Sequence, residues 1–462
     1  MEPIPWSALK EGAEQLRGAG ARDRIRRLDR LYAEVLRRRP DLVAAVARDF
    51  RKPAEEFDLT EMYVLKSEIA EAKRNLRAWM QPRRVPVGLA GLGASSWVRR
   101  EGKGVVLIVA PWNYPMQLLF RPLVSAIAAG CAAVLKPSEW TPNTARVLEE
   151  IVHAACDPKE VQIRCGGIEV SQALLELPFD HIYFTGSPAV GKLVMAAAAK
   201  HPCSVTLELG GKSPVVVDET ADIRRCARRL AWAKLTNAGQ ICVAPDHVYV
   251  HEAVADRFLA ALVEEMRALH PAGPEGSVDY PRIVAPHHAR RIAGAIEEAV
   301  AAGARVVEGG PADPDACFIP PTVLTDLPPG VRLLEDEIFG PVLPVLRFSD
   351  LDALTAHLRT LPNPLALYLF SRSRRNIRRL LDGTRSGTVG INHAVVHVAS
   401  TGLPFGGWGL SGVGTGHGIY GFLAFTHERA VYQQLFPGAS EWLRPPFTPR
   451  KRRWIAAILR WL

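Results

Sequence analysis

The chain has 462 residues, of which 48 % are hydrophobic and 23 % are charged. This length and composition are typical of a soluble globular protein of two or three domains and exclude a disordered chain. The formal net charge is +9, but residues 444–462 alone carry six Arg or Lys and no acid. Because most of the excess lies in one terminal tail, and because a second Arg-rich run at 22–39 has the spacing of an amphipathic helix, nucleic-acid binding is not predicted.

The cysteine pattern favours a reducing compartment. There are seven cysteines, an odd number, and no pair has the C-x-x-C spacing of a zinc knuckle or redox pair, so no metal site is predicted. The first residues include acids and no apolar run of signal-peptide type. No window reaches the roughly 18 consecutive apolar residues that a membrane-spanning helix needs. A cytoplasmic protein is expected.

In chain order, residues 1–83 are predicted to form amphipathic helices that end near Pro82. From 104 to 209 apolar runs of strand length alternate with helical segments, starting with "GVVLIVAP" at 104–111. Such alternation predicts a doubly wound parallel sheet that binds ligands at the carboxyl ends of its strands. A second α/β unit begins near 211, and the glycine-rich segment near 400 is predicted to be a loop or close-approach segment, not a regular element.

Two motifs in the first α/β unit suggest a nucleotide site. "FTGSPAVG" places Gly186, Ser187 and Gly191 where a strand meets a helix, and the amides of a helix start favour a pyrophosphate. The alternative for this motif is a tight turn. "LKPSE" ends a strand with Lys136 and Glu139, side chains that can hold a ribose, or that form only a surface ion pair.

Two motifs offer polar side chains for catalysis. Asn113 in "APWNYP" lies between two aromatic residues, where a rigid amide is a good oxyanion donor, or stabilises only its own turn. Glu208 in "TLELGGKSP" lies between two leucines. Burial there would raise its pKa toward the range of a general base, unless nearby amides satisfy the carboxylate.

Two further motifs supply a second carboxylate and a thiol. "EDEIFGPVLPV" places Glu337 two residues before Phe339, beside which a ribose or ring could stack. Cys242 lies in the polar, turn-forming stretch "NAGQICVAPD" at 237–246. A thiolate there could form and release an acyl intermediate. None of the thirteen histidines stands in a recognised pairing pattern with it.

Taken in order and with their separations, these motifs resemble the aldehyde dehydrogenase superfamily over residues 5 to 435. The stretches "CVAPD" and "VTLELGGKSP" are similar to its class 3 branch of fatty, aromatic and coniferyl aldehyde dehydrogenases. The resemblance implies NAD(P)-dependent oxidation of an aldehyde to a carboxylic acid, with NAD as cofactor and NADP as the alternative. A cofactor-independent thiol esterase and a CoA-acylating aldehyde dehydrogenase are the rival functions.

The resemblance also implies roles for the matching residues. Cys242 would be the nucleophile, Asn113 and the Cys242 amide the oxyanion hole, and Glu208 the base for deacylation, with Glu337 as rival base. The cofactor residues implied are Lys136 and Glu139 at the adenine ribose, Gly186, Ser187 and Gly191 at the pyrophosphate, and Glu337 and Phe339 at the nicotinamide end.

The implied fold is α/β, with two doubly wound parallel-sheet domains and a small β oligomerisation flap that makes a homodimer. The implied ranges are 1–83 and 102–209 for the NAD-binding domain, 210–400 for the catalytic domain, 84–101 and 401–435 for the flap and active-site loop, and 436–462 for a basic amphipathic tail.

Gly416, where class 3 relatives often carry Tyr, and the bulky Trp408 depart from the family pattern near the expected substrate mouth. The tail is predicted either to lie on an anionic membrane surface or to dock on the partner subunit.

Overall fold

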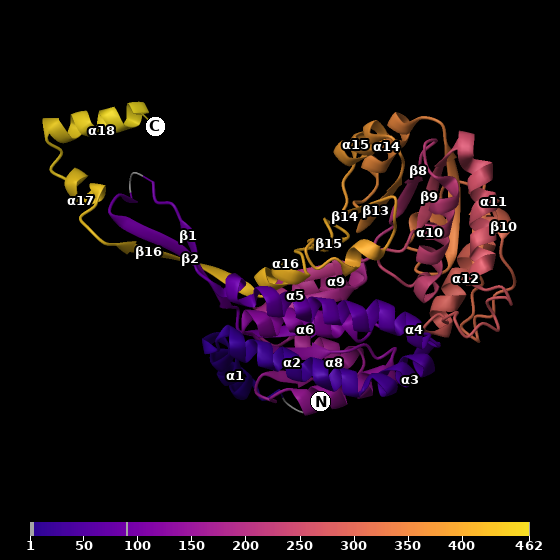
Figure 1. Cartoon of the computed structure of the whole chain (residues 1–462), viewed down its shortest axis with the longest axis horizontal. Helices are drawn as coiled ribbons and strands as arrows, with labels where there is room; N and C mark the ends of the chain where they lie inside the picture. The colour runs from indigo at the N-terminus through magenta and orange to yellow at the C-terminus, as the bar shows by residue number, and fades with distance from the viewer. Residues whose placement is uncertain (1–3, 89–90, 462) are drawn as a thin grey trace.

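The computed structural model describes residues 4–88 and 91–461, and it contains two large sheets and one small one (Figure 1). The ends of the predicted helical part and tail, residues 1–3 and 462, and residues 89–90 of the predicted flap lie outside the described residues. The predicted fold class is confirmed, because both large sheets are mostly parallel and carry helices between their strands.

The first large sheet has the strand order β15-β7-β6-β3-β4-β5. All its neighbours are parallel except β15, which runs antiparallel to β7. The chain passes outward from β3 through β4 to β5 and then returns to the other side of β3 with β6. The switch point between β3 and β6 is therefore where a doubly wound sheet binds its ligand. The strands are β3 (Val105–Val109), β4 (Ala132–Lys136), β5 (Val161–Ile163), β6 (His181–Gly186), β7 (Ser204–Leu209) and β15 (Gly412–Val413).

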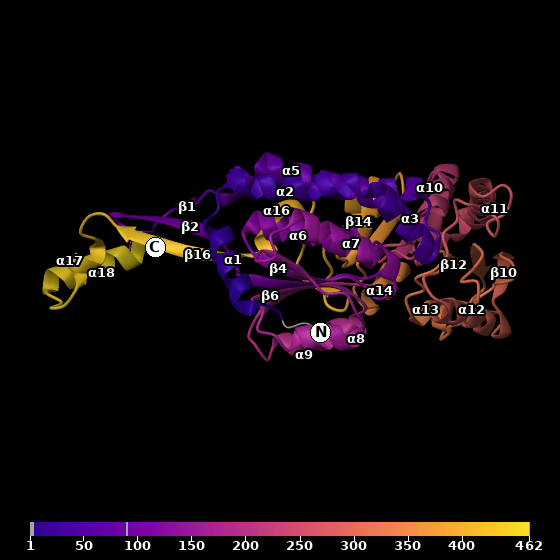
Figure 2. The same ribbon diagram turned by 90° about the horizontal axis from the view of Figure 1, so that it is seen from below.

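Helices from two parts of the chain cover this sheet. Four of them connect its strands: α6 (Gln117–Ala129), α7 (Pro142–Ala155), α8 (Ile168–Leu175) and α9 (Pro188–Ala198). Three N-terminal helices lie along α6 and α7 (Figure 2): α2 (Ala21–Arg37), α3 (Arg39–Phe50) and α5 (Tyr63–Met80). The short helix α4 (Ala54–Phe57) and the π-helix Asp58–Met62 connect α3 to α5. The first helix, α1 (Trp6–Gly18), instead packs against β3 and β4 in the core on the other face of the sheet.

The second large sheet has the order β10-β11-β12-β9-β8-β13-β14, and only the edge strand β10 is antiparallel. Its strands are β8 (Pro214–Val217), β9 (His247–His251), β10 (Arg305–Glu308), β11 (Thr322–Thr325), β12 (Val342–Phe348), β13 (Ala366–Phe370) and β14 (Thr388–Ile391). The helices around it are α10 (Ile223–Leu235), α11 (Glu252–Leu269), α12 (Pro286–Ala301), α13 (Arg332–Glu335), α14 (Leu351–Thr360) and α15 (Arg374–Gly383).

The small sheet forms an arm that projects from the body of the molecule (Figure 1). It pairs β1 (Arg83–Val85), β2 (Ala94–Gly102) and β16 (Thr426–Gln434), all antiparallel. The chain then continues into α17 (Ala439–Leu443) and α18 (Pro449–Trp461) at the end of the arm. The sheet lies where the sequence predicts the flap, and its role in oligomerisation stays a prediction.

One local expectation is wrong. The glycine-rich segment is not entirely irregular, because it contributes β15 and the helix α16 (Gly418–Ala424).

The cap of α7 comes from another helix. Thr141 precedes α7, but its hydroxyl makes no capping bond. Instead the Asp49 carboxylate from α3 accepts the amides of Asn143 and Thr144. A carboxylate also complements the positive end of the helix dipole, so α3 supplies the cap.

Candidate active site

Cys242 lies in a strained turn that follows α10. Asn237 and Ala238 have φ of 53° and 51°, in a left-handed region that costs a non-glycine residue free energy and is common at functional sites. The turn is held because the Tyr368 hydroxyl donates to the Val243 carbonyl at 2.6 Å. Cys242 itself is partly exposed and packs beside the core of the second sheet.

Asn113 comes from the other α/β unit and binds this same turn. Its buried side-chain amide donates to the Gln240 carbonyl at 2.9 Å, and its own carbonyl accepts from the Asn237 side chain at 2.9 Å. The loop after β3 and the cysteine loop are therefore joined directly. The structure thus joins Asn113 to the turn that leads to Cys242, through Gln240 and Asn237.

A third segment supports both loops, and sequence analysis missed it. Glu61, in the π-helix, accepts the amides of Met116 and Gln117 at the start of α6. Lys52 pairs with Glu61 at 2.9 Å, and both side chains are fully buried. π-helical turns are rare and often lie at functional sites. The only sequence signal was a pair of charged residues in an otherwise amphipathic helical region.

A second contact from this segment reaches the cysteine turn. The Glu56 carboxylate accepts the Asn237 amide at 3.0 Å. Since Asn237 is one of the two left-handed residues, this bond stabilises the strained conformation.

Glu208 projects from the carboxyl end of β7 on the face opposite its leucine neighbours, which pack in the core on the other side of the sheet. Its side chain is 5 % exposed, and its Oε2 atom has no hydrogen-bond partner. Its Oε1 accepts from the Tyr183 hydroxyl at 3.4 Å. Burial raises the pKa of Glu208 to about 8, against the opposing effects of Tyr183 and Arg121. Nearby amides do not satisfy this carboxylate, so a general base is a better interpretation of Glu208 than a structural carboxylate.

Glu337 lies close to the carboxyl end of β7, the strand that carries Glu208. A Cβ atom at Gly210 would be 2.1 Å from its Oε2, so the glycine after β7 makes room for this carboxylate. Burial raises the pKa of Glu337 to about 8, with Asp246 adding to the rise and the Gly211 amide opposing it. The two carboxylates have similar pKa values and differ in their partners.

The segment that carries Glu337 is fixed by residues of two other motifs. Lys212 donates to Asp246 at 2.5 Å and to the Asp336 carbonyl at 2.7 Å, while Asp246 accepts the Ile338 amide at 3.0 Å. The last lysine of "LELGGK" and the last aspartate of "CVAPD" therefore position the segment, although the letters alone gave them no role.

The Cys242 sulfur lies within the electrostatic reach of both carboxylates. Burial, with the charges of Glu337 and Glu208 adding to it, raises the pKa of the Cys242 thiol to about 12. A thiol with this pKa keeps its proton at neutral pH. An activated thiolate requires a change in this environment.

The predicted cofactor residues lie at the strand ends near the switch point. The Lys136 ammonium at the end of β4 binds Glu139 at 2.7 Å, with Lys136 buried and Glu139 partly exposed. Ser187 caps α9 by accepting the Val190 amide. A Cβ atom at Gly191 would be 2.6 Å from a Leu209 methyl, so this glycine allows α9 to pack closely on β7. The start of α9 follows β6 and Glu139 follows β4, the strands on either side of β3, and a helix start and a carboxylate at this edge of the sheet fit a pyrophosphate and its ribose.

The aldehyde dehydrogenase family profile matches residues 6–431. The 4,4'-diaponeurosporen-aldehyde dehydrogenase of Staphylococcus aureus (strain NCTC 8325 / PS 47) is 42 % identical, over 84 % of this chain and 84 % of that protein. Human aldehyde dehydrogenase family 3 member B1 is 41 % identical, over 90 % of this chain and 88 % of its own length. The chain belongs to the aldehyde dehydrogenase family.

Solved structures of aldehyde dehydrogenases agree with this membership. Staphylococcus aureus AldH in its substrate-bound state has a TM-score of 0.93 at 38 % identity, and the match covers 99 % of this chain and 100 % of that one. PnpE in complex with nicotinamide adenine dinucleotide has a TM-score of 0.83 at 26 % identity, covering 94 % and 90 %. The chain is thus an NAD(P)-dependent oxidoreductase that converts an aldehyde to a carboxylic acid. The class 3 resemblance is confirmed by the family 3 relatives.

In this aldehyde dehydrogenase a row of aromatic rings joins the two α/β units. Trp112 after β3 contacts Phe339 at 5.3 Å and His288 at 5.4 Å between ring centroids. Trp140 after β4 contacts His287 at 4.7 Å. Burial lowers the pKa of His288 to about 4, with His287 and Arg291 contributing, so this ring is neutral at pH 7. The row runs from the predicted nicotinamide end to the predicted ribose end, and sequence analysis did not find the two histidines.

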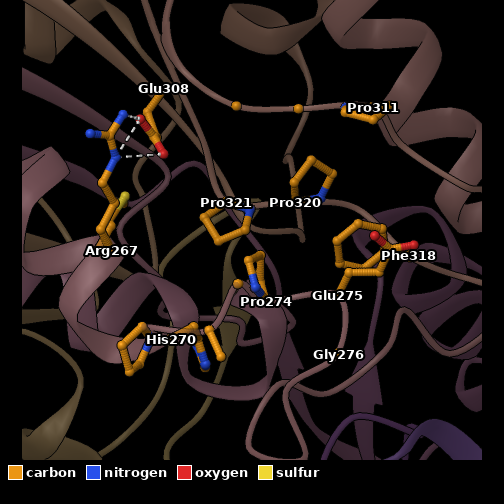
Figure 3. Close-up of a pocket in the computed structure, with 16 residues that line it drawn as sticks. Arg267, His270, Pro274, Glu275, Gly276, Glu308, Pro311, Phe318, Pro320 and Pro321 are labelled. Atoms are coloured by element: carbon orange, nitrogen blue, oxygen red, sulfur yellow. Dashed lines mark hydrogen bonds and ion pairs between the residues drawn. The ribbon is translucent and has the colours of Figure 1, made fainter.

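A cavity of about 530 Å³ in the second α/β unit lies apart from these residues (Figure 3). Prolines and Phe318 line much of it, and Arg267 forms an ion pair with Glu308 at its edge. None of the predicted site residues borders it. Among the described residues no group of three or more His, Cys, Asp or Glu side chains has the arrangement of a metal site.

Proposed function

We propose that Cys242 is the nucleophile of this aldehyde dehydrogenase, Asn113 and the Cys242 amide its oxyanion hole, and Glu208 its deacylation base. One observation carries the proposal: Asn113 is hydrogen bonded into the turn that presents Cys242, and the thiol lies under the influence of both candidate bases. An amide that is fixed and shielded before the reaction begins stabilises a developing oxyanion at no reorganisation cost.

The chemistry then follows in two stages. The Cys242 thiol passes its proton to a neighbouring carboxylate, which releases it to solvent, and the sulfur adds to the aldehyde carbon to form a thiohemiacetal whose oxygen faces Asn113. NAD(P), when bound, would supply the hydride acceptor for conversion of this carbon to a thioester. Water, losing a proton to Glu208, adds to the thioester, and the carbon–sulfur bond breaks to release the carboxylic acid and the Cys242 thiolate.

Glu208 is favoured over Glu337 as the base because of its partners. The Oε2 atom of Glu208 is buried and without a hydrogen bond, whereas the Gly211 amide stabilises the charged form of Glu337. A carboxylate oxygen with no partner is the better acceptor for a proton from water.

For the cofactor, we propose that Lys136 and Glu139 bind the adenine ribose. Gly186, Ser187 and Gly191 would lie at the pyrophosphate, and Glu337 with Phe339 at the nicotinamide end. The Glu139 carboxylate would repel a 2′-phosphate, which favours NAD over NADP. Steady-state rates with each cofactor and a panel of aliphatic and aromatic aldehydes test this preference.

The nucleophile is tested by Cys242→Ala. Aldehyde-dependent NADH formation is expected to fall by at least about 10³-fold, because no covalent intermediate can form. NAD binding, followed by calorimetry, is expected to be retained. Turnover near the wild-type rate in the variant would refute the assignment, and ester hydrolysis without NAD by the wild type would instead support the esterase function.

The base is tested by Glu208→Gln, with Glu337→Gln as the matched variant. Glu208→Gln is expected to give one burst of NADH per active site and then slow turnover by about 10²-fold or more, because the thioester accumulates. Mass spectrometry of the quenched enzyme detects the acyl group on Cys242. If Glu337→Gln accumulates the acyl-enzyme and Glu208→Gln does not, the two roles are exchanged.

We also propose that the protein is a cytoplasmic homodimer, with domains divided as in the family. The support for the flap is its geometry: β2 and β16 form a long paired ribbon away from the body, a shape suited to contact with a second copy. The seven cysteines are all free in the described structure, which agrees with a reducing compartment.

The tail is proposed to contact an anionic membrane surface. No helix within residues 4–88 and 91–461 is long and apolar enough to span a bilayer.

A further inference from the structure

Tyr183 and Glu208 occupy one face of the first sheet on adjacent strands. The β6–β7 register pairs Thr185 with Glu208 and Tyr183 with Thr206. Because side chains alternate along a strand, Tyr183, two residues before Thr185, points to the same side as Glu208. Its hydroxyl reaches diagonally along that face to Glu208 Oε1 at 3.4 Å. Hydrogen bonds that act in catalysis are often long in a protein without its ligands.

The Tyr183 ring is held in a single place. It is 5 % exposed and stacks on Phe425 with a centroid distance of 5.6 Å and an interplanar angle of 13°. Burial, with the Glu208 charge adding to it, raises the pKa of Tyr183 well above its usual value. The hydroxyl therefore keeps its proton at any working pH and acts toward Glu208 as a donor.

The glycine-rich segment makes room for this hydroxyl. A Cβ atom at Gly416 would be 2.4 Å from the Tyr183 oxygen and 3.7 Å from Glu208 Oε1. The backbone there is fixed by two hydrogen bonds between Gly416 and Phe405. No left-handed φ is recorded at Gly416, so space, and not backbone conformation, requires the glycine. The departure from the family pattern noted in the sequence therefore lies directly against the proposed base.

We propose that Tyr183 is a positioning residue for the Glu208 carboxyl, and that Gly416 is the residue that admits its hydroxyl. This inference rests on the proposed role of Glu208 as the deacylation base. The Tyr183 hydroxyl donates to Oε1 and fixes the plane of the carboxyl group, which leaves Oε2, the oxygen without a partner, to take the proton from water.

The step balances within these groups. As the water oxygen bonds to the thioester carbon, one water proton moves to Glu208 Oε2, and the Tyr183 proton stays on its own oxygen. The tetrahedral intermediate then collapses with cleavage of the carbon–sulfur bond, and the electron pair leaves with the Cys242 sulfur. No further reactant is needed.

The test is Tyr183→Phe, which keeps the ring and its stack on Phe425 and removes only the hydroxyl. A donor to the charged carboxylate is lost, so the pKa of Glu208 should rise. The decay of the acyl-enzyme, measured by quenching and mass spectrometry, is expected to slow about tenfold at pH 7. The decay rate increases with pH as Glu208 loses its proton, and the midpoint of this increase should shift upward by about one pH unit. The NADH burst is expected to stay at one per site with its wild-type rate.

Tyr280→Phe is the matched control. This tyrosine is also buried, but its hydroxyl donates to the Ile319 carbonyl in a different core. Its loss should leave both the burst and the pH dependence of acyl-enzyme decay unchanged, whatever it does to stability.

Gly416→Ala provides a second variant. The added methyl group should displace the Tyr183 hydroxyl and slow acyl-enzyme decay like Tyr183→Phe. In the double variant Tyr183→Phe/Gly416→Ala the clash is gone, so decay should be no slower than in Tyr183→Phe alone. Additive losses in the double variant would overturn the role of Gly416.

An unchanged pH dependence in Tyr183→Phe, in an enzyme whose Glu208→Gln variant accumulates the thioester, would overturn this inference alone. If Glu208→Gln does not accumulate the thioester, the proposed base itself is wrong.

Discussion

At the scale of single residues, the protonation state of the Cys242 sulfur decides whether this residue can act as the proposed nucleophile. A nucleophilic thiol is usually activated by a cationic neighbour, but here the neighbours that act on the thiol are Glu337 and Glu208, both carboxylates. Together with burial they keep the proton on the sulfur. Positive charge brought near the sulfur would lower the pKa of Cys242 and favour the thiolate that the proposed mechanism needs.

This arrangement predicts an unusual pH dependence of alkylation. With the pKa of Cys242 near 12, the rate of its reaction with iodoacetamide should rise about tenfold per pH unit from pH 7 to beyond pH 10, because only the thiolate reacts. Peptide-resolved mass spectrometry separates Cys242 from the other cysteines. Glu337→Gln should raise the rate at pH 8, since one opposing charge is removed. A rate that levels off near pH 8 would contradict the prediction.

The residues proposed to react could be named from the sequence, and the residues that contact them could not. Cys242, Asn113 and Glu208 each stand in a short motif whose residue types suggest their chemistry. Tyr183 stands in "HIYFTG" like any buried strand residue, and Glu61 looks like one more acid of an amphipathic helix. Both depend on contacts between segments far apart in the chain, and neither charge nor periodicity encodes such contacts.

At the scale of elements, the buried ion pair between Lys52 and Glu61 joins the N-terminal helices to the first sheet. Both side chains are fully buried at 2.9 Å, and Glu61 also caps α6. Glu61→Ala would leave a buried cation without its partner. We expect a loss of about 3–5 kcal/mol in the free energy of unfolding, measured by urea denaturation.

The exposed pair Lys200–Glu176, at 2.6 Å, is the matched control. Glu176→Ala should change the free energy of unfolding by less than about 1 kcal/mol, because water screens exposed charges. Equal losses of unfolding free energy in the two variants would show that burial does not make the Lys52–Glu61 pair more costly to break.

The order of elements followed well from periodicity. Continuous apolar runs such as Val105–Val109 are typical of buried parallel strands, and Gly130, with φ of 87°, is the glycine that ends α6. Two features were not predicted from the sequence. The pairing of β15 with β7 depends on a partner that lies some two hundred residues earlier, and the cap of α7 comes from Asp49 on another helix. Local propensity contains no information about either contact.

At the scale of the whole molecule, the arm and tail expose apolar surface. Phe436, Trp442, Trp454 and Leu459 are between 59 % and 71 % exposed, and α18 lies at the end of the arm (Figure 1). A helix of 13 residues is about 20 Å long, too short to cross a bilayer. Its basic residues suit the surface of an anionic membrane.

We expect the full chain to float with vesicles containing phosphatidylserine and to be released by high salt. A protein lacking residues 436–462 should stay at the bottom of the gradient. Sedimentation velocity on both proteins provides the second measurement, with a dimer expected in each because the flap is intact. If the two proteins float alike, and only the full chain is dimeric, the tail docks on the partner subunit instead.

The N-terminal helices have a consequence for the minimal enzyme. Through Asp49, Glu56 and the pair Lys52–Glu61 they contact α7, the strained turn before the nucleophile and the start of α6. A shortened protein that starts at β3 would still contain Cys242, Asn113 and Glu208, the residues proposed to touch the reacting atoms. It would nevertheless lack the contacts that hold the Cys242 turn and the Asn113 loop, and these contacts begin at Lys52, about fifty residues before the first strand of this sheet.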